Sequence, residues 1–237
     1  MVFKTALIIA GGKGTRLEEH TEDLPKPLVL IAGKPILERI IGWLKKEGVN
    51  QIILGVAYKK EMIKNHFGNG ENFGVRISYV EHDENGGTED AFKMDVEQAF
   101  DRKLIKEKNF YAMNGDQITD LSLEKLAHAH LSKNAIVTLT TINLKTNFGM
   151  VKIGEDGRVV EFKEKGEVPD KVMNAGIYVF NKDIKEYLQG GNIEENAFKK
   201  LIKDNKIYSF HHHGKWLTVN DKRELEKAEE FLKSAEN

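Results

Sequence analysis

Short apolar runs alternate with amphipathic stretches along most of the chain. The apolar runs have the length of buried strands, and in the stretches between them apolar residues recur every three or four positions, as on one face of a helix. The predicted strands are residues 6–10, 51–57, 75–80, 110–116, 135–143, 148–151, 158–164, 174–180 and 207–219. The predicted helices are residues 35–48, 58–67, 89–100, 123–132, 192–202 and 222–235. Strands that alternate with helices predict an α/β fold with a doubly wound sheet.

A glycine-rich loop follows the first predicted strand. It contains three glycines and two cations, namely Gly11, Gly12, Gly14, Lys13 and Arg16. Because glycine has no Cβ, backbone N–H groups can approach a ligand closely there, and N–H groups lining a concavity bind anions. Right-handed crossovers bring such loops to one edge of the sheet, where ligands bind. Together with Lys26, which lies between two prolines, the loop predicts a site for a polyphosphate.

The loop departs from two common phosphate-binding motifs. The dinucleotide fingerprint G-x-G-x-x-G requires a third glycine where this chain has Leu17, and the polar residues after it do not resemble a helix packed on a sheet. The P-loop motif G-x-x-x-x-G-K-[ST] has no match in the chain. Neither motif fits this loop, which is either an ordinary strand-to-loop connection or a phosphate site of another kind.

Composition narrows the classes of protein further. The 237 residues suffice for one large domain or two small ones, and the 40% apolar fraction suffices for a sizeable core. A net charge of −1 gives no basic field for nucleic acid or an anionic membrane. No apolar run reaches the roughly 18 residues of a membrane span, and the absence of Cys excludes disulfides and thiolate metal sites. We expect a cytoplasmic protein that binds neither nucleic acid nor membrane.

Several polar residues have a local explanation beside a functional one. Asp116 ends a predicted strand in the run Asn-Gly-Asp, which is either a turn or a carboxylate that reaches a ligand past a flexible glycine. Three adjacent histidines at 211–213 alternate between the faces of a strand, so they cannot all chelate one ion, and a surface strand is favoured. His128 and His130 are expected on the surface of their helix.

The glycine-rich loop and the segments after it resemble the signature of the sugar-1-phosphate nucleotidylyltransferases, or NDP-sugar pyrophosphorylases. The family pattern is G-G-x-G-T-R-L followed by P-K-P, and this chain has GGKGTRL, then PKPL and AGKPIL, in the same order and at the same spacing. The resemblance covers nearly the whole chain. It implies a single domain, residues 1–237, with a Rossmann-like mixed sheet of the nucleotide-diphospho-sugar transferase type. Many relatives add a left-handed β-helix, which we do not expect here.

By this resemblance, residues 1 to about 120 form the nucleotide-binding half. A glycine-threonine pair whose backbone approaches the base matches Gly87 and Thr88, but the small residues that usually follow are replaced here by Glu89 and Asp90. Thr88 also suits the N-cap of the helix predicted at 89–100, whose first turn is acidic. The implied nucleotide-binding residues are Ala10, Gly11, Gly12, Gly14, Thr15, Gly87 and Thr88.

Residues from about 121 to 237 correspond to the sugar-binding half. The motifs FGMV, FKEK and NAGIYVF carry this resemblance, with a hairpin turn predicted at residues 154–157 between the first two. In the family the Glu holds sugar hydroxyls, the Lys reaches the sugar phosphate and the Asn contacts the sugar, although the Glu-Lys pair also fits a solvated turn. The implied sugar-phosphate-binding residues are Gly149, Glu164, Lys165 and Asn174, with Glu194 as a further candidate.

The resemblance also implies a magnesium site. Family members bind catalytic Mg²⁺ through an aspartate at the position of Asp116. The second ligand is an aspartate in many relatives, where this chain has Thr218, but the run V-N-D-K resembles a branch in which the asparagine ligates the metal. We therefore expect Asn220 as the second ligand, since a carbonyl oxygen is a suitable ligand for Mg²⁺. Alternatively, Asn220 or Asp221 caps the last helix.

The implied reaction transfers a nucleotidyl group from an NTP to a sugar 1-phosphate and gives an NDP-sugar and pyrophosphate. The implied catalytic residues are Arg16, Lys26 and Asp116, with Mg²⁺ as cofactor. Two alternatives stay open: a non-catalytic regulatory subunit that binds sugar nucleotides, or an enzyme whose acceptor is another phosphate ester, such as phosphocholine. Neither the base nor the sugar can be read from the sequence, and a homo-oligomer is possible.

Overall fold

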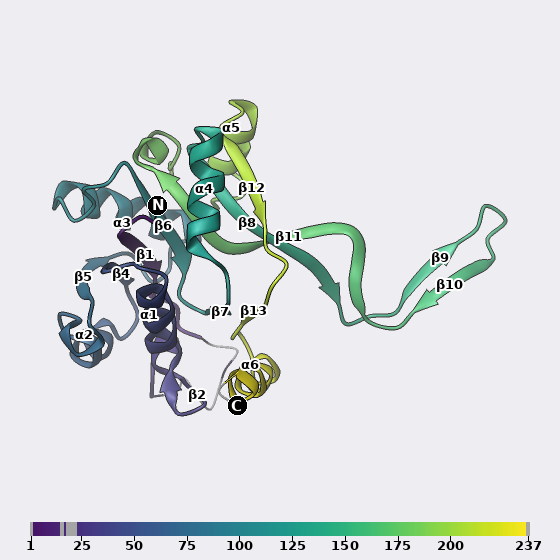
Figure 1. Ribbon diagram of the computed structural model, residues 1–237, viewed down its shortest axis with the longest axis horizontal. Coiled ribbons are helices and arrows are strands. Elements are labelled where there is room, and N and C mark those ends of the chain that lie inside the picture. The colour runs from purple at the N-terminus through teal and green to yellow at the C-terminus, as the bar shows by residue number, and fades with distance from the viewer. Residues whose placement is uncertain (1, 15–16, 18–22, 236–237) are drawn as a thin grey trace.

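A seven-stranded mixed sheet forms the centre of the computed structural model, which describes residues 2–14, 17 and 23–235 (Figure 1). The strand order is β12-β8-β11-β6-β1-β4-β5, and in these described residues only β11 runs antiparallel to its neighbours. The strands are β1 (Thr5–Ile9), β4 (Gln51–Val56), β5 (Arg76–Glu81), β6 (Asn109–Asn114), β8 (Val137–Thr146), β11 (Gly166–Asn181) and β12 (Ile207–His211). The predicted α/β fold is therefore confirmed.

Helices cover both faces of this sheet. One face carries α1 (Ile36–Lys46), α2 (Lys60–Phe67) and α4 (Leu123–Lys133), and α6 (Lys222–Ala235) joins the same core beside the short strands Leu30–Ile31 and Trp216–Thr218. The other face carries α3 (Thr88–Asp101) and α5 (Ala197–Lys203). Successive residues of β1 enter opposite cores, because Ile8 packs with the first set of helices and Leu7 with the second. The doubly wound arrangement follows from this alternation.

Short elements complete the fold. Two further strand pairs lie beside the main sheet, namely β2 (Leu30–Ile31) with β3 (Lys34–Pro35) and β7 (Gln117–Thr119) with β13 (Trp216–Thr218). The 3₁₀ turns of residues 23–235 are η2 (Lys26–Leu28), η3 (Glu71–Phe73) and η4 (Lys182–Glu186). In the part of the chain that the structure describes, no helix is long and apolar enough to cross a membrane.

Three element predictions were wrong in extent. The strand predicted at residues 174–180 begins earlier, at Gly166 of β11. The strand predicted at residues 207–219 is two strands, β12 and β13, which join different sheets. The helix predicted at residues 192–202 begins only at Ala197. Before it, the side chain of Asn192 accepts hydrogen bonds from the backbone N–H groups of Glu194 and Glu195, at 2.9 and 3.2 Å. These side-chain hydrogen bonds hold a local turn, so the helix begins only after it.

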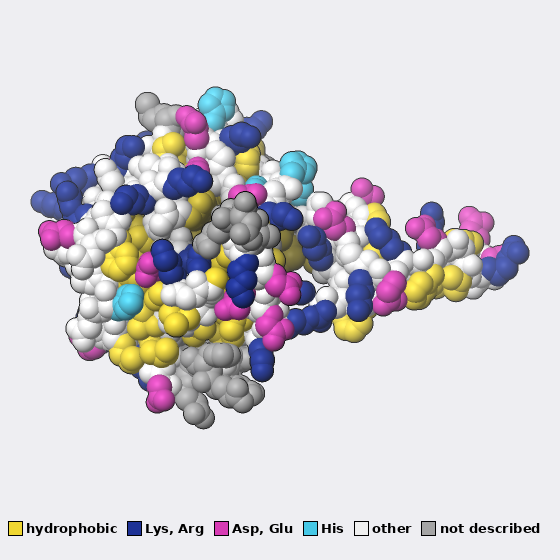
Figure 2. Space-filling view, turned by 60° about the horizontal axis from the view of Figure 1, so that its bottom comes forward, with side chains coloured by type: hydrophobic (Ala, Val, Ile, Leu, Met, Phe, Trp, Pro, Cys, Tyr) yellow, Lys and Arg dark blue, Asp and Glu magenta, His cyan; other side chains and the backbone are white. Residues whose placement is uncertain are grey.

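A hairpin arm projects from the body of the molecule (Figure 1). It consists of β9 (Met150–Ile153) and β10 (Val159–Lys163). The predicted turn at residues 154–157 is confirmed, because Gly154 donates to the carbonyl of Arg158 at 2.9 Å and Gly157 has φ +79°. Cross-strand partners share a face, and the pairs Val151–Phe162 and Ile153–Val159 make one face apolar and exposed (Figure 2).

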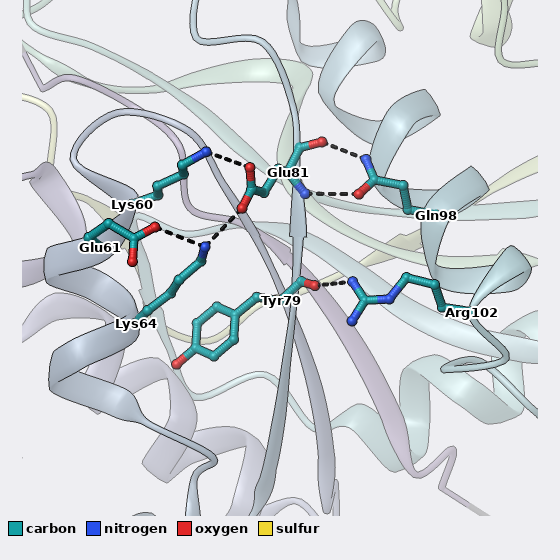
Figure 3. A network of polar contacts seen from close by, with 7 residues as sticks. All are labelled: Lys60, Glu61, Lys64, Tyr79, Glu81, Gln98 and Arg102. Atoms are coloured by element: carbon teal, nitrogen blue, oxygen red, sulfur yellow. Dashed lines mark hydrogen bonds and ion pairs between the residues drawn. The ribbon is translucent and has the colours of Figure 1, made fainter.

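Polar side chains close the outer edge of β5, the last strand of the sheet (Figure 3). Gln98 hydrogen-bonds both the N–H and the carbonyl of Glu81, and Arg102 donates to the carbonyl of Tyr79. Ammonium groups of Lys60 and Lys64 pair with the Glu81 carboxylate and lower its pKa to about 2. The edge is thereby protected from pairing with another strand.

The expected surface position of His130 is wrong, whereas His128 is exposed as predicted. His130 is 2% exposed and lies between Thr138 and Asn109. The oxygen Asn109 Oδ1 accepts hydrogen bonds from the Asn181 amide and from the Nε2–H of His130, and the Nδ1 of the ring accepts from the Thr138 hydroxyl. Burial lowers the pKa of His130 to about 4, because a neutral ring satisfies these partners and a charged one is desolvated.

This buried histidine predicts a pH-dependent loss of stability. The unfolded chain binds a proton near pH 6.5 and the folded chain only near pH 4, so folding stability falls as the pH drops through that window. The full effect is about 3 kcal/mol. The free energy of unfolding, measured with urea, should fall between pH 7 and pH 4 in the wild type and in His128→Gln. In His130→Gln it should fall less, and an equal fall there would contradict the low pKa of His130.

Candidate active site

The loops after β1 and β6 meet at one edge of the sheet. The two strands are parallel neighbours, and the chain winds away from β1 on both sides, so their carboxyl ends form a switch point where ligands bind. Gly115 donates its N–H to the carbonyl of Ile9 at 2.9 Å. A Cβ on Gly115 would stand 2.7 Å from that oxygen, so glycine is required for the close approach. The glycine-rich loop and Asp116 are thereby placed side by side.

The glycine-rich loop is described from Ala10 to Gly14, while Thr15 and Arg16 lie outside the described residues. Gly11 is buried, and a Cβ there would press against His82 and stand 2.8 Å from the Cβ of Ala57. A Cβ added to Gly12 would have no neighbour within 4 Å among the described residues. The two glycines thus differ in surroundings, since Gly11 packs against the protein, and the nucleotide-binding role of both stays a prediction.

A buried histidine–aspartate pair supports this loop and was missed by the sequence analysis. His82 Nδ1 lies 3.0 Å from Asp95 Oδ2, and their side chains are 5% and 0% exposed. Burial raises the pKa of Asp95, which the His82 ring opposes. A signal did exist, because Asp95 interrupts the apolar face of its helix beside Val96, and Gly55 in β4 leaves space for its carboxylate.

Lys13 connects the glycine-rich loop to the loop after β5. Its ammonium lies 3.1 Å from Glu84 Oε1 and 3.5 Å from Asn85 Oδ1. The backbone carbonyl of Gly11 accepts from the Tyr58 N–H at 3.4 Å, which fixes the other side of the loop. The two segments predicted to bind the nucleotide are therefore in direct contact.

Three predicted residues meet beside this loop. The ammonium of Lys26 lies 2.7 Å from Asp116 Oδ2 and 2.8 Å from Asn220 Oδ1. The Lys26 and Asp116 side chains are 13% and 21% exposed, so the cluster opens to solvent. A carboxylate and a carbonyl oxygen within hydrogen-bond distance of one nitrogen suit a hard cation such as Mg²⁺, which keeps waters and takes phosphate oxygens. The residues present therefore fit the metal.

The small pair β7–β13 brings Asp116 and Asn220 together. Thr218 pairs with Gln117, and the Val219 N–H donates to the Asp116 carbonyl at 3.1 Å. Asp221 accepts from the Glu224 N–H at 2.8 Å and so caps α6. The alternative helix-cap role therefore falls to Asp221, and the Asn220 side chain is left to Lys26.

Glu224 holds the segment before α6 in place. Its Oε2 accepts from the Asn220 N–H at 2.9 Å and from the Thr218 hydroxyl at 2.8 Å. Thr218, which stands where many relatives have an aspartate, thus makes a structural hydrogen bond here.

The NAG motif forms a bulge in β11 next to the same edge. The register with β8 shifts between Asn174 and Tyr178, and Gly176 has φ +70°. A Cβ on Gly176 would press against Gln117 and stand 2.7 Å from Asn114 Nδ2, so the motif packs directly against the strand end that carries Asp116.

Asn174 connects the bulge to Glu194. Its Nδ2 donates to the Tyr178 hydroxyl at 2.8 Å and lies 3.5 Å from Glu194 Oε1, while its Oδ1 accepts from Gly176 at 3.0 Å. Burial raises the pKa of Tyr178, so its hydroxyl stays neutral. Asn174 and Glu194, two of the predicted sugar ligands, therefore lie together.

The remaining sugar-side residues lie at the base of the arm. A Cβ on Gly149 would stand 3.2 Å from Glu164 Oε2, so these two are neighbours, and Lys165 is exposed with φ +50°. Among the described residues, no hydrogen bond joins Glu164 or Lys165 to Asp116 or Lys26. The roles of Gly149, Glu164 and Lys165 stay predictions.

The N-cap of α3 is Gly87 rather than Thr88, so this prediction was wrong by one residue. Asp90 explains the shift, because its carboxylate reaches back to the Gly87 N–H at 2.9 Å and occupies the helix N-terminus itself. Gly87 and Thr88 are both exposed there.

The histidines at 211–213 alternate as the strand pattern predicts. The rings of His211 and His213 meet edge to face, with centroids 4.4 Å apart and planes at 80°, while His212 turns the other way toward Asp120, at 2.9 Å. Neighbouring β-strand side chains point to opposite faces, so the three rings do not converge.

Comparisons with known proteins agree with this fold. Residues 5–234 match the model of the family described as nucleotidyl transferase. The chain is 36% identical over 210 residues to a D-glycero-α-D-manno-heptose 1-phosphate guanylyltransferase of Aneurinibacillus thermoaerophilus, covering 86% of this chain and 88% of that protein. It is 32% identical over 243 residues to a probable glucose-1-phosphate cytidylyltransferase of Bacillus subtilis, covering 93% and 92%.

A solved structure indicates the same class of protein. HddC from Yersinia pseudotuberculosis superposes with a TM-score of 0.73 at 27% identity, over 97% of this chain and 100% of that one. HddC has also been solved in complex with GMP-PN. The fold and the site define a nucleotide-binding α/β enzyme. The chain belongs to the sugar-1-phosphate nucleotidylyltransferase family, and it is a nucleotidyltransferase.

The two glycines of the loop predict opposite effects of the same substitution. Gly11→Ala should lower the free energy of unfolding by about 1–3 kcal/mol, because its methyl group overpacks His82 and Ala57. Gly12→Ala should leave stability within about 0.5 kcal/mol. Its methyl group should instead obstruct the ligand and raise the KM for NTP by roughly 10-fold, equivalent to about 1.4 kcal/mol. Urea unfolding measures the stability of each variant, and steady-state rates measure its KM for NTP. Equal effects of the two substitutions on both quantities would contradict the different surroundings of Gly11 and Gly12.

Proposed function

We propose that the protein transfers a nucleotidyl group from an NTP to a sugar 1-phosphate and releases pyrophosphate. The observation that carries the proposal is the cluster of Lys26, Asp116 and Asn220 beside the glycine-rich loop. It combines a cation with two hard oxygen ligands at the carboxyl edge of the sheet. The names of the relatives support sugar 1-phosphates as acceptors, with guanylyl and cytidylyl groups among those transferred.

The proposed reaction needs no general base. The attacking group is the sugar phosphate, whose second pKa is about 6, so it is mostly dianionic at neutral pH. A phosphate oxygen attacks the α-phosphorus of the NTP, a new P–O bond forms, and the bond to the pyrophosphate breaks. Two anions must meet, so catalysis depends on positioning and on neutralising charge.

Each part of the site has a role in this scheme. The backbone N–H groups of the glycine-rich loop hold the triphosphate, and Arg16 holds the leaving phosphates. Asp116 and Asn220 would bind Mg²⁺, which supplies positive charge to the phosphates of both substrates. Lys26 would pair with a phosphate group, and Lys165 and Glu164 would bind the sugar phosphate and the sugar hydroxyls. We also propose the cytoplasm, where NTP is available, as its location.

The proposed reaction is tested by pyrophosphate release from a matrix of NTPs and hexose or heptose 1-phosphates, with Mg²⁺ or with EDTA. We expect at least one strongly active pair that requires the metal. A matrix without turnover, with nucleotide binding intact, would refute the proposal and favour a regulatory protein. Release with phosphocholine alone would name another class of acceptor.

The active pair then tests the cluster. Asp116→Ala should lower kcat by at least about 100-fold, because removing one group that stabilises transition-state charge has an effect of this size. The exposed helix residue Asp101 offers a matched control, and Asp101→Ala should keep wild-type rates. Full activity of Asp116→Ala would contradict the assignment.

A further inference from the structure

Glu89 is a buried carboxylate whose described hydrogen-bond partners are backbone groups of the other half of the chain. The side chain is 0% exposed. Its Oε1 accepts from the N–H groups of Gln189 and Gly190, at 2.7 and 2.9 Å, and its Oε2 accepts from the Ala197 N–H at 3.3 Å. A buried carboxylate is stable when several N–H groups surround it. The segment before α5 is therefore folded around the side chain of Glu89.

Asp90 adds a second connection on the same side. Its Oδ1 accepts from the Gly191 N–H at 2.8 Å and its Oδ2 from the Gly87 N–H at 2.9 Å. These backbone hydrogen bonds lower the pKa of Asp90, so it is ionised at neutral pH. The Gly191 carbonyl in turn accepts from the Glu89 N–H at 3.2 Å. We call Glu89 and Asp90, together with residues 189–191, the acidic clasp.

Glycines make the fit of the clasp close. Gly190 and Gly191 have φ +103° and +94°, which favour glycine. A Cβ on Gly190 would stand 2.7 Å from Asp90 Oδ1, and a Cβ on Gly87 would press against the Gly191 carbonyl. The two segments therefore touch through their backbones.

The clasp lies between the two predicted binding loops. On one side Asp90 holds Gly87, next to Thr88 of the nucleotide loop. On the other side the held segment continues through Asn192, whose side chain accepts from the Glu194 N–H at 2.9 Å. Glu194 then lies 3.5 Å from Asn174. A displacement of residues 189–191 would therefore change the position of Glu194 relative to Asn174.

We propose that Glu89 and Asp90 are positioning residues that fix the sugar-side loop against the nucleotide loop, and so set the affinity for the sugar 1-phosphate. This inference rests on the proposed function. Glu89 contacts only the sugar-side segment among its hydrogen-bond partners, whereas Asp90 holds both segments. The two acids therefore affect the two substrates differently.

The test is a comparison of steady-state constants in the full chain, with the active NTP and sugar 1-phosphate pair of the wild type. Glu89→Gln places an amide N–H against backbone N–H groups. We expect the KM for the sugar 1-phosphate to rise about 10-fold, while kcat and the KM for NTP stay within about 3-fold. Glu97→Gln, on the exposed side of the same helix, serves as the matched control and should behave as the wild type.

Asp90 provides a second variant in case Glu89→Gln does not fold. Asp90→Ala should raise the KM of both substrates by about 10-fold, and Asp90→Asn, which keeps one acceptor oxygen, should restore part of the loss. A purely structural role would lower the melting temperature and the amount of active enzyme, but would leave both KM values unchanged.

The outcomes separate the two proposals. An active wild type with unchanged KM values in folded Glu89 and Asp90 variants would overturn the role of the clasp alone. A wild type that releases no pyrophosphate from any pair would overturn the proposed function, and the role of the clasp with it.

Discussion

The contact of one ammonium group with two oxygens organises the site. Lys26 Nζ lies 2.7 Å from Asp116 and 2.8 Å from Asn220, residues that are 90 and 194 positions away in the sequence. Each partner comes from a different element. Asp116 follows the central strand β6, Asn220 follows β13 at the start of α6, and Lys26 begins the turn η2. The short strands β7 and β13 pair beside the main sheet, and this pairing brings the side-chain oxygens of Asp116 and Asn220 together. Without that pairing Lys26 would lack one of its two oxygen partners.

Close backbone contacts are the second constraint, and the motif glycines provide them. Gly115 passes the carbonyl of Ile9, Gly176 packs on Asn114 and Gln117, and Gly11 packs on His82. At these positions the family motifs specify how the segments around the site fit together. Gly12 differs from the other three, because no described atom lies within 4 Å of a Cβ added there. The same residue type thus has packed surroundings in one place and open ones among the described residues in another, and only the structure distinguishes these cases.

Local patterns predicted much of the fold. The helix predicted at 222–235 has those bounds in α6, because its apolar stripe and its capping Asp221 are both local. The meeting of Lys26, Asp116 and Asn220 also agrees with the motifs. Predictions were wrong where distant residues decide. His130 was assigned to the surface because its partners Asn109 and Thr138 come from other strands. The carboxylates of Glu89 and Asp95 were not recognised as buried, since the N–H groups and the ring that bind them lie elsewhere in the chain.

The central claim is that Asp116 and Asn220 form one cation site. It can be measured directly by titrating Mn²⁺ into the protein with an equal concentration of a non-hydrolysable NTP analogue, and following the free ion by electron paramagnetic resonance. Asn220→Ala is compared with Asp221→Ala, since the neighbouring Asp221 side chain caps the helix. We predict that Asn220→Ala weakens Mn²⁺ binding by about 10-fold, or about 1.4 kcal/mol, and that Asp221→Ala binds as the wild type does. Wild-type affinity in Asn220→Ala would contradict the account.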